Sequence, residues 1–329
     1  MYFDVSQNNI VYETVNDWNS AIVAAKGEKL DLLGHVTNVI DWLDLDDSEK
    51  FMDNFNKETP PFMTYSYLGM HMKDPKLADK RVRLAINQLV DVPKINETVS
   101  YGMNKRIVGN IIPSMGAAYN HDIEPYQYDL DKAKELLDEA GWKDTNNNGI
   151  RDMMIDGKLT ELSLNYAFNK GNNAREKIGL IIQEEFKKAG IEINVQAFEW
   201  SVYLEKLKNH EDIDMFYSAW VMDPRPSDPI QIWGTDSYNG GSNYCGFGNA
   251  ETDALIEEIR AELDEDKRNE LYHRWQEILH EEVPCVFLFT SDRRMAVHKR
   301  FTNLNDGARD PGHWTPGFTL ASGFSSFVN

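Results

Sequence analysis

The chain has 329 residues, a length typical of about two domains. Its 54 acidic and 34 basic residues give a formal net charge of −20, which argues against nucleic acid and anionic membrane surfaces as partners. Apolar runs are only a few residues long and Met1 is followed at once by Tyr2-Phe3-Asp4, so neither a membrane span nor a signal peptide is expected.

The first sixty residues are acidic and weakly patterned. A strand is predicted from Ile10 to Val15, and a short helix from Trp18 to Ala25 that ends at Gly27. These elements hold too few apolar residues in register to form a core alone. The first strong break is Thr59-Pro60-Pro61, and the aromatic-rich run from Phe62 to Met72 predicts a strand after it.

Two amphipathic helices come next. Asp79 is the predicted N-cap of the first, whose apolar residues fall at helical spacing: Val82, Ala85, Ile86, Leu89 and Val90. Arg81 and Arg83 would lie off this stripe, which favours ion-paired surface positions for both. Asp129 is the predicted N-cap of the second helix, and Gly141 is its predicted stop.

A loop rich in oxygen side chains covers residues 144–152. Gly149 would form the sharp turn of an EF-hand calcium loop, and the ligand positions would be Asp144, Asn146, Asn148, Ile150 and Asp152. The match fails at position 12, where Ile155 replaces the bidentate glutamate. The alternative is a turn whose Asp and Asn side chains bond to their own backbone, and both interpretations remain open.

From Thr160 onward the pattern becomes regular. Alternating apolar residues predict strands at 162–166, 191–197 and 213–220, with helices between them that begin after caps at Asn173 and Ser201. This β-α-β-α-β order predicts a parallel sheet, in which ligands bind beyond the carboxyl ends of the strands. Those ends carry these candidate ligand-binding residues: Asn169, Trp200, Trp220 and Asp223.

The third of these strands stops at an acid and a proline-rich turn. Pro224, Pro226 and Pro229 prevent the strand from continuing, because proline supplies no backbone donor. We interpret Trp220 to Pro229 as one wall of a ligand cleft; the alternative is a buried tryptophan followed by an Asp-Pro turn. The hydrogen-bond-rich loop 238–244 adds Asn243 and Tyr244 as candidate ligand contacts.

Signatures of catalysis are scarce in the sequence. It contains no Gly-rich phosphate loop, no His-Glu-x-x-His and no Gly-x-Ser-x-Gly. Cys245 and Cys285 are too few for a disulfide framework or a four-cysteine metal site, and they predict packed small side chains. A hydrolase that uses Asp223 and Asp228 as an acid/base pair is one alternative function, and a calcium-stabilised structural or binding module is another.

Several runs of the chain coincide with one family pattern, in the same order. The first two are Ala78-Asp79-x-Arg81-Val82-Arg83-x-Ala85-Ile86 and Tyr128-Asp129-x3-Ala133-Lys134-x-Leu136-Leu137-x2-Ala140-Gly141-Trp142. After them come Glu199-Trp200, the Trp220 to Pro229 turn, Asn243-x3-Phe247-x-Asn249, and Pro284 with its apolar strand. In this order and spacing, the chain resembles the extracytoplasmic solute-binding proteins of peptide-type ABC importers, solute-binding protein family 5.

The resemblance implies an α/β fold of the periplasmic-binding-protein-like class II. Residues 66–284 would form the complete second lobe, with a parallel or mixed sheet flanked by helices. Residues 1–65 and 285–329 would be parts of the first lobe. The family is longer by half or more, so this chain resembles its C-terminal portion, and the family's N-terminal region and secretion or lipoprotein signal would lie outside it.

The resemblance also implies a function without catalysis or a cofactor. The protein would be periplasmic or extracytoplasmic and membrane-anchored, and would deliver peptides or related small solutes to ABC permease subunits with their ATPase subunits. Asp223, three residues after Trp220, would bind the α-ammonium of a peptide, with Asp228 as the alternative anchor. Trp220 would form a cleft wall, and we expect this portion alone to bind weakly because closure between two lobes supplies much of the contact.

Overall fold

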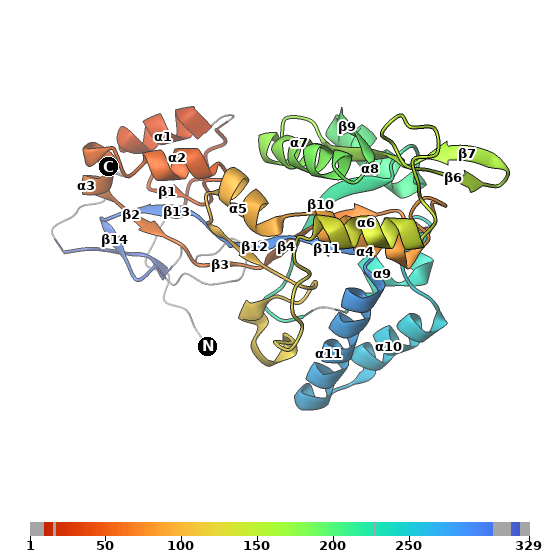
Figure 1. Ribbon diagram of the computed structural model, residues 1–329. Coiled ribbons are helices and arrows are strands. Elements are labelled where there is room, and N and C mark those ends of the chain that lie inside the picture. The colour runs from red at the N-terminus through yellow and green to blue at the C-terminus, as the bar shows by residue number, and fades with distance from the viewer. Residues whose placement is uncertain (1–9, 16–17, 227, 305–316, 323–329) are drawn as a thin grey trace. The chain divides into compact units, whose positions relative to one another are not determined.

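The computed structural model describes residues 10–15, 18–226, 228–304 and 317–322 (Figure 1). The chain divides into two compact units, the first made of Met1–Met63 with Ser291–Asn329 and the second of Thr64–Thr290. The assignment of residues 1–65, 66–284 and 285–329 to two lobes stays a prediction. Within the described residues, no helix is long and apolar enough to cross a membrane.

The first unit brings distant parts of the chain into one small sheet. Its strand order is β1-β13-β2, and both pairings are antiparallel. The elements of this unit are α1 (Trp18–Lys26), β1 (Leu32–Leu33), α2 (Val39–Asp44), α3 (Glu49–Asn54), β2 (Phe55–Glu58), β3 (Pro61–Phe62), β13 (Met295–His298), β14 (Phe301–Thr302) and β15 (Thr319–Leu320). The strand predicted at residues 10–15 is wrong: this segment has no regular structure, and Val11 and Tyr12 are exposed.

A five-stranded mixed sheet forms the centre of the second unit. Its strands are β4 (Thr64–Met70), β8 (Ser163–Asn169), β9 (Glu192–Phe198), β10 (Met215–Val221) and β11 (Cys285–Phe287), in the order β11-β4-β10-β8-β9. β8 is parallel to both β9 and β10, as the β-α-β-α-β pattern predicts. β4 is antiparallel to both β10 and β11. The predicted mixed α/β fold is thus confirmed.

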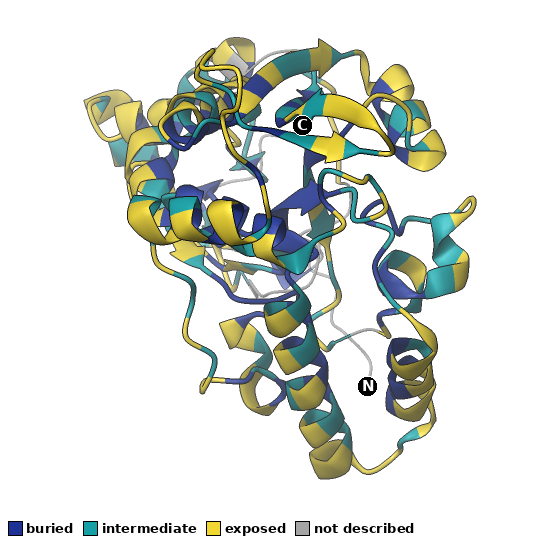
Figure 2. Ribbon diagram, turned by 45° about the vertical axis from the view of Figure 1, so that its right-hand side comes forward, coloured by how far each residue is buried: buried dark blue, intermediate teal, exposed yellow. Residues whose placement is uncertain are grey.

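The helices of the second unit each have a buried side (Figure 2). They are α4 (Lys80–Leu89), α5 (Val92–Ser100), α6 (Leu130–Glu139), α7 (Asn173–Lys187), α8 (Trp200–Asn209), α9 (Ile230–Trp233), α10 (Ala250–Ala261) and α11 (Glu265–Glu282), with 3-10 turns η1 (Pro113–Ala118) and η2 (Thr235–Tyr238). α4, α7 and α8 contact strands of the sheet, whereas α10 and α11 contact each other and α11 also contacts the turn η1. The remaining elements are β5 (Asn104–Arg106), the hairpin β6 (Asp152–Ile155) and β7 (Lys158–Glu161), and β12 (Phe289–Asp292), which runs into the first unit. The predicted caps Asp79 and Asp129 accept backbone N–H bonds at the starts of α4 and α6, whereas α7 is capped by Asn172.

Arg83 connects the start of α4 to the end of α11. Its side chain is buried, and its guanidinium donates to the carbonyls of Ala78 (2.7 Å) and Glu282 (2.9 Å). The expected surface position of Arg83 is therefore wrong. The last carbonyls of a helix lack intrahelical partners, and the guanidinium supplies donors for one of them at the end of α11.

Gly69 has no side chain, which leaves room for the ring of Phe216 where β4 and β10 pair. Gly69 lies directly opposite Phe216, and a Cβ at Gly69 would fall 2.1 Å from Cζ of Phe216. We expect Gly69→Ala to lower the free energy of unfolding by about 1–3 kcal/mol, since the buried ring must move. The measurement is urea unfolding, with Gly109→Ala as the control, because a Cβ there meets only the side chain of Gln276, at 3.4 Å from Cγ and 4.0 Å from Cβ. Equal stability of the Gly69 variant and the parent would contradict this account.

Two histidines and a tyrosine stack where β4, α8 and η2 meet. The ring centroids of His71 and His210 are 4.9 Å apart, and those of His210 and Tyr238 are 3.9 Å apart. Burial and the neighbouring His210 lower the pKa of His71 from 6.5 to about 4, and burial lowers the pKa of His210. The nearby charges are Lys73, 3.5 Å from the centroid of the Tyr238 ring, and Asp214, which pairs with Lys76 at 2.7 Å.

This stack predicts a loss of stability in mild acid. In the unfolded chain His71 binds a proton near pH 6.5, whereas in the folded protein it does so only near pH 4. Between these two pH values the unfolded state binds more protons than the folded state. The free energy of unfolding therefore falls as the pH is lowered from about 6.5 to about 4. We expect urea midpoints at about pH 7 and about pH 4.5 to differ less for His71→Gln than for the parent protein. The exposed His121 is the matched control, and His121→Gln should keep the parent's pH dependence. An unchanged dependence in His71→Gln would refute the prediction.

Candidate functional site

Four of the predicted ligand-binding residues lie at one edge of the sheet. Asn169 is the last residue of β8, Trp200 follows β9 as the first residue of α8, and Trp220 and Asp223 lie at and beyond the end of β10. β8 is parallel to both β9 and β10, so all three strands run in the same direction. Their carboxyl ends therefore point to the same edge of the sheet. The structure thus places Asn169, Trp200, Trp220 and Asp223 at or just beyond the carboxyl ends of these three strands.

β8 and β10 separate at this edge. β8 pairs with β9 along all of Ser163–Asn169, but with β10 only at Met215 and Phe216. Beyond that point the hydroxyl of Tyr203 donates to the carbonyl of Tyr217 at 2.5 Å, in the place of a strand partner. Among the described residues, Ser218 to Val221 consequently have a ladder partner on the β4 side alone.

Trp220 is held in place by β4. Its indole N–H lies 3.3 Å from the hydroxyl of Tyr67, and its carbonyl accepts a 2.8 Å hydrogen bond from Thr64. The side chain is partly exposed, and Trp200 is 55% exposed. Two large aromatic side chains are therefore partly exposed at this edge. Exposed aromatic surface of this kind is typical of a site that a partner or ligand covers.

The two candidate acids differ in what surrounds them. Asp228 accepts a 3.0 Å hydrogen bond from the backbone N–H of Ile230, and its other oxygen lies 3.6 Å from Nε of Arg260. Asp223 is exposed and has no hydrogen bond or ion pair with any residue that the structure describes. Only Asp223 is therefore an uncommitted carboxylate at the sheet edge.

Arg175 is a candidate site residue that the sequence-based prediction did not include. Its guanidinium lies 4.5 Å from the centroid of the Tyr217 ring, and it donates to Oδ1 of Asn169 at 2.6 Å. No carboxylate among the described residues pairs with it. Its place in the first turn of the helix after β8 is the one sequence signal that could have indicated it, because this turn begins at the ligand edge of a parallel sheet.

Asn243 and Tyr244 have structural contacts instead. Asn243 is buried, its amide N–H groups donate to the carbonyls of Gly234 (3.0 Å) and Phe247 (2.8 Å), and its Oδ1 accepts from the Phe247 N–H (3.2 Å). Tyr244 is buried with its ring against Phe216. Their hydrogen-bonding groups and apolar surfaces stabilise the loop, and their predicted contact with ligand stays a prediction.

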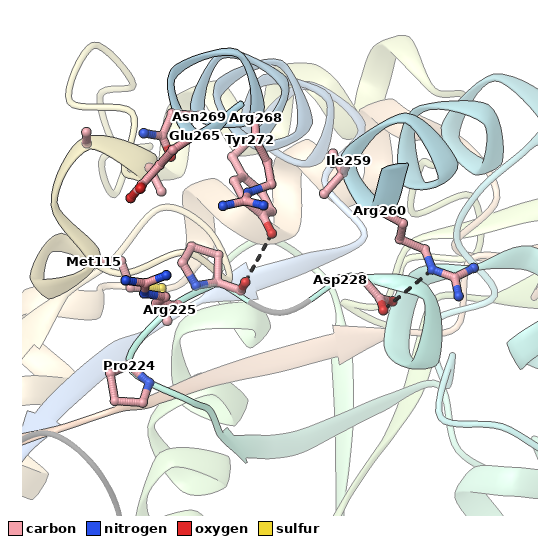
Figure 3. A pocket seen from close by; sticks show the side chains of 13 residues that line it. Met115, Pro224, Arg225, Asp228, Ile259, Arg260, Glu265, Arg268, Asn269 and Tyr272 are labelled. Carbon is pink, nitrogen blue, oxygen red and sulfur yellow. Dashed lines mark hydrogen bonds and ion pairs between the residues drawn. The ribbon is translucent and has the colours of Figure 1, made fainter. Parts of the chain in front are cut away.

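A cavity of about 440 Å³ lies beside the turn that follows β10 (Figure 3). The turn contributes Pro224, Arg225, Pro226 and Asp228, and the opposite wall comes from η1 and from the facing ends of α10 and α11. Asp228 and Arg260 face each other on one side of it. The cavity thus contains the second candidate acid but not Asp223.

The oxygen-rich loop bonds mainly to its own backbone. Asp144 accepts from the N–H groups of Asn148 (3.1 Å) and Gly149 (2.9 Å), and Asn148 accepts from that of Ile150 (2.8 Å). Asp152 is buried and accepts from Thr145, while Asn146 accepts from the Asn148 N–H. In the described part of the chain, no three His, Cys, Asp or Glu side chains are grouped to hold a metal ion. Calcium binding by Asp144, Asn146, Asn148, Ile150 and Asp152 stays a prediction.

The calcium prediction has a direct test. If the loop binds calcium, millimolar calcium should raise the melting temperature and EDTA should reverse the rise, because a ligand bound only by the folded state stabilises it. Asp144→Asn should reduce the response, whereas magnesium at the same ionic strength should not reproduce it. A melting temperature indifferent to calcium and EDTA would leave the loop as a self-bonded turn.

The sequence is similar to known binding proteins along most of its length. It is 30% identical over 295 residues to the oligopeptide-binding protein AppA of Bacillus subtilis, covering 88% of this chain and 52% of that protein. It is 30% identical over 234 residues to the dipeptide-binding protein of Escherichia coli, covering 69% of this chain and 40% of that protein. The chain thus spans about half the length of the curated relatives it matches.

The fold is similar to theirs as well. The structure of AppA from Bacillus subtilis in complex with a nonapeptide superposes with a TM-score of 0.78 at 29% sequence identity, covering 92% of this chain and 58% of that one. Residues 4–242 match the family described as bacterial extracellular solute-binding proteins, family 5 middle. The chain therefore belongs to family 5 of the bacterial extracellular solute-binding proteins.

Proposed function

We propose that this protein is the solute-binding component of an ABC importer, which binds peptides or related small solutes outside the cytoplasmic membrane. Membership of family 5 supports this proposal, and so do the peptide-binding names of its relatives. The solute would pass to transmembrane permease subunits driven by their ATPase subunits. A periplasmic or extracytoplasmic location, with a lipoprotein anchor in the whole protein, belongs to the same proposal.

The open edge of β10 is the observation that carries the peptide assignment. Ser218 to Val221 have a ladder partner on one side only, so an extended peptide can add as a further strand along the other side. Main-chain hydrogen bonds of this kind do not depend on the ligand's side chains. They suit a protein that accepts many peptide sequences.

The charges at the two ends of this edge set the direction of the peptide. Asp223 lies beyond the carboxyl end of β10, whereas Arg175 lies over Tyr217, nearer its middle. A peptide whose α-ammonium pairs with Asp223 would run antiparallel to β10 and point its carboxyl end towards Arg175. In the proposal Trp220 and Trp200 flank the peptide with apolar surface.

The hydrolase alternative has less support than binding. An acid/base pair needs two carboxylates free to act on the substrate, and Asp228 is occupied by Arg260 and by the Ile230 N–H. The family is one of binding proteins. We propose accordingly that the chain catalyses no reaction.

Calorimetry of the whole protein with short peptides tests the peptide assignment. We expect Asp223→Asn and Arg175→Gln each to weaken peptide binding by about tenfold or more, because each removes a charge-assisted hydrogen bond. N-terminal acetylation of the peptide should weaken binding to the parent protein but have little further effect in Asp223→Asn.

The control variant is Glu211→Gln, which removes an exposed carboxylate from the turn after α8 and should bind as the parent does. Equal affinity of Asp223→Asn and the parent for free and acetylated peptides would remove Asp223 from the site. Turnover of the peptide by pure protein would replace the binding function with an enzymatic one.

A further inference from the structure

The cavity beside the turn after β10 is built from three separate segments. It has a volume of about 440 Å³, enough for a small organic molecule, and its walls are Pro224 to Pro226 with Asp228, the end of η1, and the facing ends of α10 and α11 (Figure 3). It includes neither Trp220 nor Asp223. The cavity is therefore distinct from the proposed peptide site, and its function does not depend on that proposal.

Hydrogen bonds between these segments keep the cavity open. The hydroxyl of Tyr272 in α11 donates to the carbonyl of Pro226 at 3.1 Å, which holds the turn. On the other side, His273 donates to the carbonyl of Ala117 and Gln276 to that of Ala118, both at 2.8 Å, which hold η1 against α11. The turn and η1 are thus both bonded to α11, which fixes the space between them.

Three arginines from three elements line this cavity, although the chain as a whole carries a net charge of −20. Arg260 is neutralised by Glu257 at 2.7 Å and by Asp228 at 3.6 Å. Arg268 donates to the backbone carbonyl of Glu262 at 3.2 Å and has no carboxylate partner among the described residues.

Arg225 makes no hydrogen bond or ion pair with any described residue, so its guanidinium donors are free. Glu265 is the single lining carboxylate without an arginine partner among them. Three guanidinium groups and two carboxylates line the cavity, so the lining residues carry one more positive than negative charge. Arg225, Arg268 and Glu265 have no ion-pair partner among the described residues.

We propose that this cavity binds an oxyanion, the carboxylate or phosphate group of a small solute, between Arg225 and Arg268. A guanidinium presents its N–H donors in a planar fork that matches two oxygens of such a group. Figure 3 shows both side chains directed into the same side of the cavity. The amide of Asn269, one helical position from Arg268, adds a donor on the same wall.

Titration of the protein with inorganic phosphate, followed by calorimetry and melting temperature at constant ionic strength, tests the proposal. We expect saturable binding that raises the melting temperature, which sodium chloride does not reproduce. Arg225→Gln and Arg268→Gln should each weaken phosphate binding by about tenfold or more. The same titration is repeated with acetate. Tighter binding of acetate than of phosphate would indicate a carboxylate solute, and tighter binding of phosphate would indicate a phosphorylated one.

Arg274→Gln is the matched control, because Arg274 lies on the same helix but pairs with Glu251 at 3.2 Å outside the cavity. It should bind phosphate as the parent does, and so should Asp223→Asn, which separates this site from the peptide site. Arg225 makes no hydrogen bond or ion pair with any described residue, so Arg225→Gln should fold normally. This variant therefore tests the proposal even if Arg268→Gln is unstable. Unaltered phosphate affinity in Arg225→Gln, or an equal effect of chloride, would overturn the proposal.

Discussion

The unequal pairing of β10 is the constraint on which the candidate site depends. β10 is bonded to β4 along its whole length, but to β8 at only two residues. The antiparallel partner is enough to hold β10 extended, while the separation from β8 leaves part of one strand edge unpaired. Tyr203 satisfies one carbonyl of this edge, and Arg175 covers the ring of Tyr217. A single break in one ladder therefore leaves part of a central strand open to backbone hydrogen bonding.

Aromatic side chains on the same face of the sheet as Trp220 supply the rigidity that this opening requires. The ring of Tyr67 contacts those of Phe216, Trp233 and Phe287, and the rings of Trp233 and Phe287 contact each other. Gly69 leaves space for the Phe216 ring, and the Tyr67 hydroxyl meets the indole of Trp220. Arg83 bonds the end of α11 to the start of α4. Trp220 is thus positioned by Tyr67, which itself packs in the aromatic cluster.

The arginines of the second unit differ in whether a carboxylate pairs with them. Those paired with a carboxylate in the described chain are Arg81, Arg83, Arg151, Arg260 and Arg274. An acid-rich protein offers partners readily, so guanidinium groups without a carboxylate are informative. Arg106 also has no carboxylate partner among the described residues, and its guanidinium donates to the carbonyl of Tyr126. Arg175 lies at the sheet edge, and Arg225 and Arg268 line the neighbouring cavity. Both places where we propose ligands thus hold an arginine without a carboxylate partner among the described residues.

Elements whose causes are local could be predicted from the amino-acid sequence. The helix caps at Asp79 and Asp129, the β-α-β-α-β order and the position of Trp220 and Asp223 at a strand end depend on side-chain periodicity and on residues a few positions apart. The family motifs, which are also contiguous, pointed to the right family.

Four features became visible only in the folded chain: the burial of Arg83, the place of Arg175 over Tyr217, the pairing of Asp228 with Arg260, and the lack of a strand at residues 10–15. Each depends on a partner that is remote in sequence, or on its absence. Periodicity reports which face of an element is apolar, but it does not report which distant segment packs against that face.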